Sequence, residues 1–190
     1  EHIPAIVNAW YPGEQGGTAV ADVLFGDYNP AGRLPLTYYK SLDELPAFDD
    51  YDITKGRTYK YFKGDVLYPF GYGLSYSSFK YSDLKVKDGA NTVSVSFRLK
   101  NTSKRKGDEV AQVYVRIPET GGVVPIKELK GFRRIPLKSG ESGVVEIELD
   151  KEQLRYWDAG LGQFIVPQGA FDIMVGASSK DIRLQTVINL

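Results

Sequence analysis

Apolar and polar residues alternate along much of the chain after residue 79, in short segments separated by turn-forming residues. The clearest segment spans 92–99, where Val93, Val95, Phe97 and Leu99 alternate with serine and arginine. Such alternation is typical of a β-strand with one buried and one solvated face. Related patterns predict further strands at 110–117, 129–137, 143–149, 162–166, 170–177 and 182–188.

About seven short strands within roughly 110 residues is the pattern of an immunoglobulin-like or fibronectin type III-like β-sandwich. We therefore expect a mainly β fold class, with the sandwich at 79–190. On this interpretation Gln112 and Tyr114 lie on the wet face of one strand, and Asp108 and Glu109 also face solvent. A single helical turn is expected at 151–154, after the capping residue Asp150.

Residues 1–55 indicate a different kind of structure. Ala5 to Trp10 is a nearly continuous apolar run, which predicts a strand buried on both faces. The apolar spacing within 18–25 predicts a helix that ends at Gly26, and 33–39 is expected to be extended near a sheet edge because it contains Pro35.

A strand, a helix and a strand make one unit of an α/β layer, and such a unit cannot cover both faces of its first strand. The chain also begins with Glu1 rather than methionine. We therefore expect it to be the rear part of a longer polypeptide.

Between these two regions, 56–78 is rich in tyrosine, phenylalanine and glycine. Aromatic rings among turn-forming residues favour a rigid surface segment that clamps two folded bodies over a flexible tether. The predicted organisation is an α/β remnant at 1–55, an aromatic linker at 56–78 and the β-sandwich at 79–190.

Composition narrows the range of partners. The 24 basic and 24 acidic residues cancel to zero formal net charge, and no basic stripe stands out. Attraction to nucleic acid or to an anionic membrane is therefore not expected. No apolar run of about 18 residues exists, so no membrane span is predicted. The chain has no cysteine, which excludes disulfides and a thiolate nucleophile.

Few residues carry obvious chemistry. The one histidine, His2, stands at the very start of the chain, and no Ser–His–Asp triad can be assembled around it. Several acids crowd one loop and could act as an acid–base pair or bind calcium: Asp43, Glu44, Asp49, Asp50 and Asp52. Calcium-loop spacing is missing, so a solvated loop is the preferred interpretation. We predict no catalytic residue, no metal site and no cofactor.

Glu14 is one candidate for a position close to substrate. It lies between a predicted strand end and a helix N-terminus, where outward N–H groups can bind hydroxyl-rich or anionic ligands. The competing interpretation is that Gly16 and Gly17 allow close helix packing while Glu14 favours the positive end of the helix dipole.

Arg57, Tyr59 and Tyr61 are the other candidates. With Phe62, they could present a sugar-stacking face, because aromatic rings bind the apolar faces of pyranoses while arginine donates to hydroxyl groups. The competing interpretation is packing between domains. Trp10 and Trp157 are likewise expected to be core or interface residues rather than sugar-binding platforms.

Several motifs resemble glycoside hydrolase family 3. Residues 11–35, which read Tyr-Pro-Gly-Glu-Gln-Gly-Gly-Thr-Ala-Val-Ala-Asp-Val-Leu-Phe-Gly-Asp-Tyr-Asn-Pro-Ala-Gly-Arg-Leu-Pro, resemble the end of the family's second, α/β sandwich domain. Residues 56–76 begin with Gly-Arg-Thr-Tyr and end with Tyr-Pro-Phe-Gly-Tyr-Gly-Leu-Ser-Tyr. They are similar to the segment through which β-glucosidases and β-xylosidases of the family enter a C-terminal fibronectin type III-like domain. Glu-Leu-Lys-Gly-Phe at 128–132 and Leu-Arg-Tyr-Trp-Asp at 154–158 also resemble that domain.

The resemblance implies a parent enzyme that is a retaining exo-glycosidase, acting on β-xylosides or β-glucosides of plant-type oligosaccharides. Its reaction uses two carboxyl groups about 5 Å apart. In the family, the nucleophilic aspartate lies on an N-terminal barrel and the acid/base glutamate lies upstream of the motif at 11–13. Neither position is present, so we expect these residues alone to hydrolyse nothing and to need the barrel and α/β domains as partners. A periplasmic or secreted location is implied by the resemblance alone.

The sandwich could stabilise the enzyme as a scaffold or bind polysaccharide. Its predicted wet faces carry mainly Ser, Arg, Lys, Glu and Gln rather than a row of Tyr or Trp, which favours the scaffold. A free-standing adhesion module is a more distant alternative, because it would need 1–55 to form a self-sufficient lobe. The residues that would meet the sugar lie upstream, so the choice between xylose and glucose stays open, although the Arg-Thr-Tyr at 57–59 leans toward β-xylosidase-like members.

Overall fold

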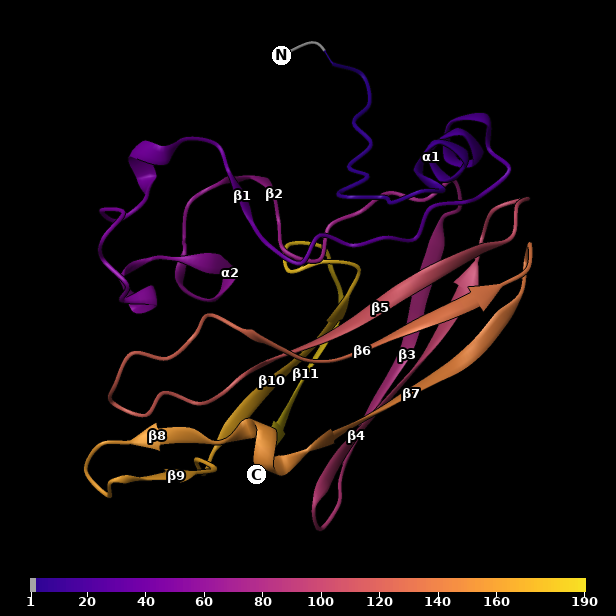
Figure 1. The fold of residues 1–190 in the computed structure, drawn as a ribbon. Helices are drawn as coiled ribbons and strands as arrows, with labels where there is room; N and C mark the ends of the chain where they lie inside the picture. The colour runs from indigo at the N-terminus through magenta and orange to yellow at the C-terminus, as the bar shows by residue number, and fades with distance from the viewer. Residues whose placement is uncertain (1–2) are drawn as a thin grey trace.

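A computed structural model describes residues 3–190, and its main body is a sandwich of two antiparallel sheets (Figure 1). The four-stranded sheet has the order β11-β10-β5-β6, formed by Ile182–Asn189, Ala170–Gly176, Gly107–Arg116 and Glu128–Leu137. The three-stranded sheet has the order β3-β4-β7, formed by Phe79–Asp88, Thr92–Asn101 and Ser142–Asp150. The predicted mainly β sandwich is confirmed.

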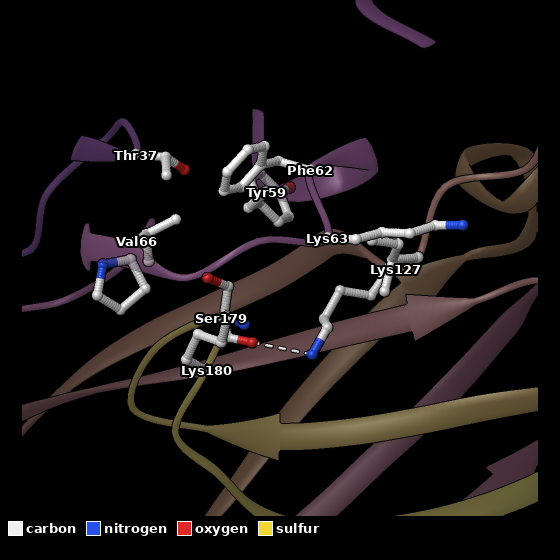
Figure 2. Close-up of a pocket in the computed structure, with 10 residues that line it drawn as sticks. Thr37, Tyr59, Phe62, Lys63, Val66, Lys127, Ser179 and Lys180 are labelled. Carbon is white, nitrogen blue, oxygen red and sulfur yellow. Dashed lines mark hydrogen bonds between the residues drawn. The ribbon is translucent and has the colours of Figure 1, made fainter. Parts of the chain in front are cut away.

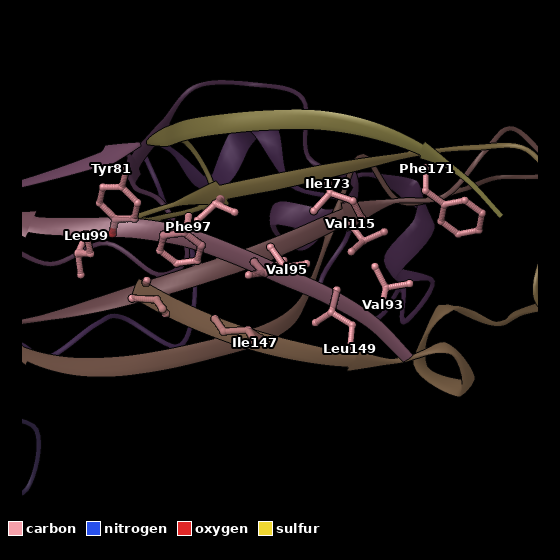
Figure 3. Close-up of a cluster of buried hydrophobic side chains, with 14 of the residues drawn as sticks. Tyr81, Val93, Val95, Phe97, Leu99, Val115, Ile147, Leu149, Phe171 and Ile173 are labelled. Carbon is pink, nitrogen blue, oxygen red and sulfur yellow. The ribbon is translucent and has the colours of Figure 1, made fainter. Parts of the chain in front are cut away.

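The core lies between the two sheets (Figure 3). In the three-stranded sheet Val93 pairs with Leu149 and Val95 with Ile147, and all four side chains are buried. Val115 and Ile173 pair across β5 and β10 and face them from the opposite sheet. The inward-facing positions are thus the apolar ones of the sequence alternation, because a period of two sends every second side chain to the same face.

Among residues 3–190, the sandwich has seven strands, but one of them differs from the predicted set. Strand β3 was not predicted because its apolar and polar residues do not alternate regularly. The structure shows an irregularity at the same place: Asp83 has a positive φ of 58°, and the pairing with β4 shifts register between Ser82 and Lys85. A bulge of this kind interrupts the two-residue period.

The expectation of a sandwich strand at 162–166 was wrong. Strand β9 (Gln163–Ile165) instead pairs with β8 (Tyr156–Asp158) in a separate hairpin. The Asp158 carboxylate accepts hydrogen bonds from the N–H groups of Gly160 and Leu161, which closes the turn locally. In Figure 1 this hairpin extends from the side of the sandwich away from α1.

The predicted helix is confirmed as α1 (Gly16–Phe25), which ends where Gly26 adopts the left-handed conformation at φ 84° and donates its N–H to Val23 O. The predicted turn at 151–154 is confirmed as the 3₁₀ helix η3 (Lys151–Leu154), with the Asp150 side chain accepting from the Glu152 N–H.

The predicted buried strand at Ala5–Trp10 was wrong. No strand forms there, and Ile6 and Val7 are 62% and 48% exposed. A strand buried on both faces needs neighbouring strands and covering layers, and the described part of the chain supplies neither. Of the expected extended piece at 33–39, Tyr38–Tyr39 forms strand β1, which pairs with β2 (Val66–Tyr68). Leu34 also donates to Tyr72 O and accepts from the Gly71 N–H, both at 2.8 Å.

The remaining elements belong to the loop and linker that precede the sandwich. They are the 3₁₀ helices η1 (Leu42–Glu44) and η2 (Ile53–Lys55) and the short helix α2 (Thr58–Tyr61). Within residues 3–190, no helix combines the length and apolar character needed to cross a bilayer.

Candidate functional site at the linker

The linker packs on the outer face of the four-stranded sheet through Tyr59 of α2. The Tyr59 ring stacks on Phe70, with ring centroids 4.2 Å apart, and meets Tyr114 of β5 edge-on at 6.0 Å. Its hydroxyl accepts a hydrogen bond from the Leu129 N–H at 3.0 Å. Burial raises the pKa of both Tyr59 and Tyr114. Tyr59 therefore joins the linker to two strands of the sandwich.

The outer face of β5 is covered and not wet, which corrects the expectation for Gln112 and Tyr114. Both are almost completely buried. The Gln112 amide donates to Gly71 O of the linker at 3.1 Å and to Ala177 O at 2.7 Å, while the Tyr114 hydroxyl donates to Gln112 Oε1 at 2.6 Å. Sequence alternation identifies the two faces of a strand but does not show what lies on the second one.

Glu109 also departs from the expectation of solvent exposure. Its Oε1 accepts from Arg33 Nη2 at 2.7 Å, and the two side chains are only 6% and 9% exposed. Arg33 comes from the segment before β1, so this buried ion pair joins the first part of the chain to β5. Glu109 shares the inward parity of Ala111 and Val113, which explains its burial.

Glu128 forms a second charged contact between linker and sandwich. It accepts from Lys60 Nζ at 2.5 Å and from Lys130 Nζ at 2.9 Å. Although burial opposes ionisation of Glu128, the hydrogen bonds from Lys60 and Lys130 lower its pKa. Beside it, the Ile126 N–H donates to Lys60 O at 2.7 Å.

Arg57 organises the preceding loop. Its guanidinium donates to the carbonyl oxygens of Asp50, Pro46 and Ala47 at 3.1, 3.2 and 2.6 Å. These three bonds direct the side chain to backbone groups of the loop at 46–50.

Among residues 3–190, no hydrogen bond or aromatic contact joins the other two sequence candidates to Tyr59. Tyr61 is partly buried, and burial raises its pKa. Glu14 is exposed in the turn before α1, which has no side-chain cap. The structure therefore does not bring Glu14, Arg57, Tyr59 and Tyr61 together into one face.

The acidic loop uses its carboxylates as turn caps. Asp52 accepts from the Thr54 N–H and hydroxyl, and Asp50 accepts from the Asp52 N–H and from Lys55 Nζ. The hydrogen bond from Lys55 lowers the pKa of Asp50, and that from Thr54 lowers the pKa of Asp52. Across residues 3–190, no group of three or more His, Cys, Asp or Glu side chains is arranged to hold a metal ion.

A cavity of about 220 Å³ lies where the linker meets the sandwich (Figure 2). Tyr59 and Phe62 form part of its wall, and Lys127 lies on the opposite side with its Nζ donating to Ser179 O at 2.8 Å. Of the four sequence candidates, only Tyr59 lines this cavity. Lys127 and Ser179 gave no signal in the sequence, because their positions depend on how the loops after β5 and β10 fold toward the linker.

Neither tryptophan is a core residue of the described chain, and the expectation that they pack at an interface between domains stays a prediction. Trp10 is 53% and Trp157 is 54% exposed. Trp157 packs edge-on against Phe164 across the β8–β9 hairpin, with ring centroids 5.2 Å apart and planes at 70°.

Comparison with protein families gives two matches. Residues 1–76 match the glycosyl hydrolase family 3 C-terminal domain, and 109–179 match the fibronectin type III-like domain.

Individual relatives agree with these matches. A xylan 1,4-β-xylosidase of Xylanibacter ruminicola is 46% identical over 98% of the chain, and a periplasmic β-glucosidase of Salmonella typhimurium is 37% identical over 94%. The chain spans about a quarter of the length of these relatives, 22% and 25% respectively.

Among solved structures, β-glucosidase 3B from Thermotoga neapolitana in complex with glucose superimposes with a TM-score of 0.89. The two are 35% identical over 96% of this chain and 27% of that one. The family matches and the shared fold lead to one conclusion. The chain belongs to glycoside hydrolase family 3 and carries its C-terminal and fibronectin type III-like regions.

Proposed function

We propose that this chain is the non-catalytic, stabilising C-terminal portion of a retaining exo-β-glycosidase that hydrolyses β-xylosides or β-glucosides. The proposal extends to partners: the barrel and α/β domains that carry the reacting carboxyl groups in the parent enzyme. The names of the relatives, a xylosidase and β-glucosidases, support the substrate class. A periplasmic or secreted location is proposed because one relative is named as periplasmic.

One observation supports the stabilising role: the hydrogen-bonding and aromatic groups of the linker contact the sandwich of the same chain. Tyr59 is stacked and hydrogen-bonded, Gly71 O accepts from Gln112, and Phe70 O accepts from the Ser179 N–H. Because the linker bonds to strands and loops of the sandwich at several points, we expect it to hold the preceding domain in a fixed position relative to the sandwich.

The alternative is a polysaccharide-binding module. Flat, exposed rings would favour it, because sugars stack on ring faces. Trp157 and Phe164 form an exposed aromatic pair beside the sandwich, but their planes stand at 70° to one another and make no continuous platform. Phe132 of β6 is a further exposed ring. The geometry therefore supports the scaffold.

Two assays test the proposal. The chain, incubated with an aryl β-xyloside and an aryl β-glucoside, is expected to give no turnover above a buffer control, and measurable turnover would refute the non-catalytic role. In the full-length polypeptide, Tyr59→Ala is expected to lower the unfolding temperature while leaving kcat/KM of the folded enzyme unchanged. Retention of the chain on insoluble xylan, abolished by Trp157→Ala, would favour the binding module instead.

A further inference from the structure

We infer that the cavity between linker and sandwich binds a small carboxylate that carries several hydroxyl groups. Its lining combines three lysines with apolar and aromatic side chains and contains no acid (Figure 2). The inference deepens the proposed function in one respect, since a uronic acid residue of a polysaccharide is one source of such a group. The binding site itself is argued from the cavity alone.

The first observation is uncompensated positive charge. Lys63, Lys127 and Lys180 line the cavity, and none of them forms an ion pair within residues 3–190. Lys127 is partly buried, and within residues 3–190 the only hydrogen bond of its side chain goes to the neutral carbonyl of Ser179. Burial lowers the pKa of Lys127, and the cation of Lys180 lowers it further.

Other partly buried lysines on this face are each paired with a carboxylate. Lys60 and Lys130, which are also partly buried on this face, both contact the Glu128 carboxylate. Burying an ammonium group is costly unless an anion accompanies it. Lys127 lacks that anion, so a ligand carboxylate is the group that would complete its surroundings.

The second observation is an unpaired hydroxyl. Thr37 also lines the cavity, and its Oγ1 is buried without a hydrogen-bond partner in the described chain. Buried side-chain hydroxyls in folded proteins usually have a partner. Because almost none of this oxygen is accessible, a ligand hydroxyl would bond to it only after a local shift of the cavity wall. Thr37 and Lys127 lie on opposite sides of the cavity in Figure 2, which separates the hydroxyl site from the carboxylate site.

The apolar wall and the volume fix the size of the ligand. Phe62, Val66 and Ile126 supply carbon surface that suits the C–H face of a pyranose ring. A cavity of about 220 Å³ is smaller than the roughly 300–1,000 Å³ of pockets that hold drug-sized molecules. It would therefore take a single ring or an equally short hydroxy acid, and not an oligosaccharide.

Calorimetric titration of the 190-residue chain tests the inference with three probes: glucuronate, the neutral sugar glucose, and gluconate as a free hydroxy acid. We expect glucuronate to bind and glucose to bind at least about tenfold more weakly, because a hydrogen bond to a charged group is worth more than one to a neutral group. Equal affinity for gluconate would identify free hydroxy acids as the source of the ligand. Preference for glucuronate would identify a ring-form uronic acid, such as a single-residue end or branch of a polysaccharide. Equal binding of glucose and glucuronate, or no binding of either acid at millimolar concentration, would overturn the inference.

Variants locate the site. Lys127→Met is expected to weaken glucuronate binding about tenfold or more, whereas Lys85→Met, on the exposed part of β3, should leave it unchanged. Because a substitution at the partly buried Lys127 could impair folding, exposed Lys180→Met provides a second test and should weaken binding without altering the unfolding temperature. Unaltered affinity in both Lys127→Met and Lys180→Met would contradict the assignment. Turnover by the chain would refute the proposed function but leave this binding result intact, so the two can fail separately.

Discussion

Arg33 and Glu109 form a buried ion pair, with Nη2 and Oε1 2.7 Å apart, between the segment before β1 and strand β5. The pair places charge at the edge of an apolar core, where each partner compensates the other. Removing one partner leaves the other charge buried without compensation. This relationship makes the first part of the chain and the sandwich interdependent.

Glu109→Ala is therefore expected to destabilise the chain by about 3–5 kcal/mol, measured by urea unfolding. The neighbouring acid supplies a matched control, because Asp108 pairs with Arg134 at a site where the Arg134 side chain is 51% exposed. Asp108→Ala should cost less than about 1 kcal/mol. Equal losses at the two positions would show that the Arg33 contact is unimportant.

Tyr114→Phe removes the hydroxyl that donates to Gln112 Oε1 at 2.6 Å. The free energy of unfolding is expected to fall by about 1 kcal/mol, the typical worth of a buried hydrogen bond. Tyr51→Phe is the control, since Tyr51 is 85% exposed and should show no change. A neutral Tyr114→Phe would mean that the covered face of β5 is not held by this bond.

Gly71→Ala tests the close contact between the linker and β5. Gly71 has a φ of +80°, and an added Cβ would lie 2.1 Å from Gln112 Oε1. Gly56 has a similar φ of +98° but has open space around the Cβ position. Gly56→Ala should cost only backbone strain, roughly 1–2 kcal/mol, and Gly71→Ala clearly more, measured by thermal unfolding. Similar losses would place the linker farther from Gln112 than the structure does.

Glu128 makes the stability of the contact between linker and sandwich depend on pH. Its folded-state pKa is lowered, so its carboxylate contributes stability above the unfolded value of about 4.3, and this contribution disappears as the pH falls through the folded-state value below it. Glu128→Gln should therefore reduce stability at pH 7 and flatten the loss of stability between about pH 5 and the acid limit. Unfolding free energies measured from pH 7 downward check this. Parallel curves for the two proteins would contradict the assigned role.

The sandwich was predictable from sequence because its inner face follows a strict two-residue period from 92 to 99 and again near 145–149. Strand β3 was missed because the bulge near Asp83 breaks that period. The strand expected at 5–10 reflects a real apolar signal, but the described residues contain no neighbour that could pair with it.

The site was only partly predictable. The sequence predicted an aromatic linker at 56–78 and named Tyr59 among its candidate residues, but that this linker clamps two folded bodies stays a prediction. The sequence could not show that Gln112 and Tyr114 lie beneath that linker, because polar residues on a covered face resemble polar residues on a wet one. The position of Lys127 beside Ser179 depends on contacts between loops far apart in the chain.

Native-state hydrogen exchange of the 190-residue chain tests the central claim most directly, namely that linker and sandwich fold as one body. The Leu129 N–H donates to Tyr59 and the Ser179 N–H donates to Phe70 O, so both amides report on the linker's attachment. We predict that both exchange with a free energy within about 1 kcal/mol of that of the core amides of β4, as expected for global unfolding. Fast exchange of Leu129 and Ser179 while β4 stays protected would show that the linker detaches on its own, and would contradict the account.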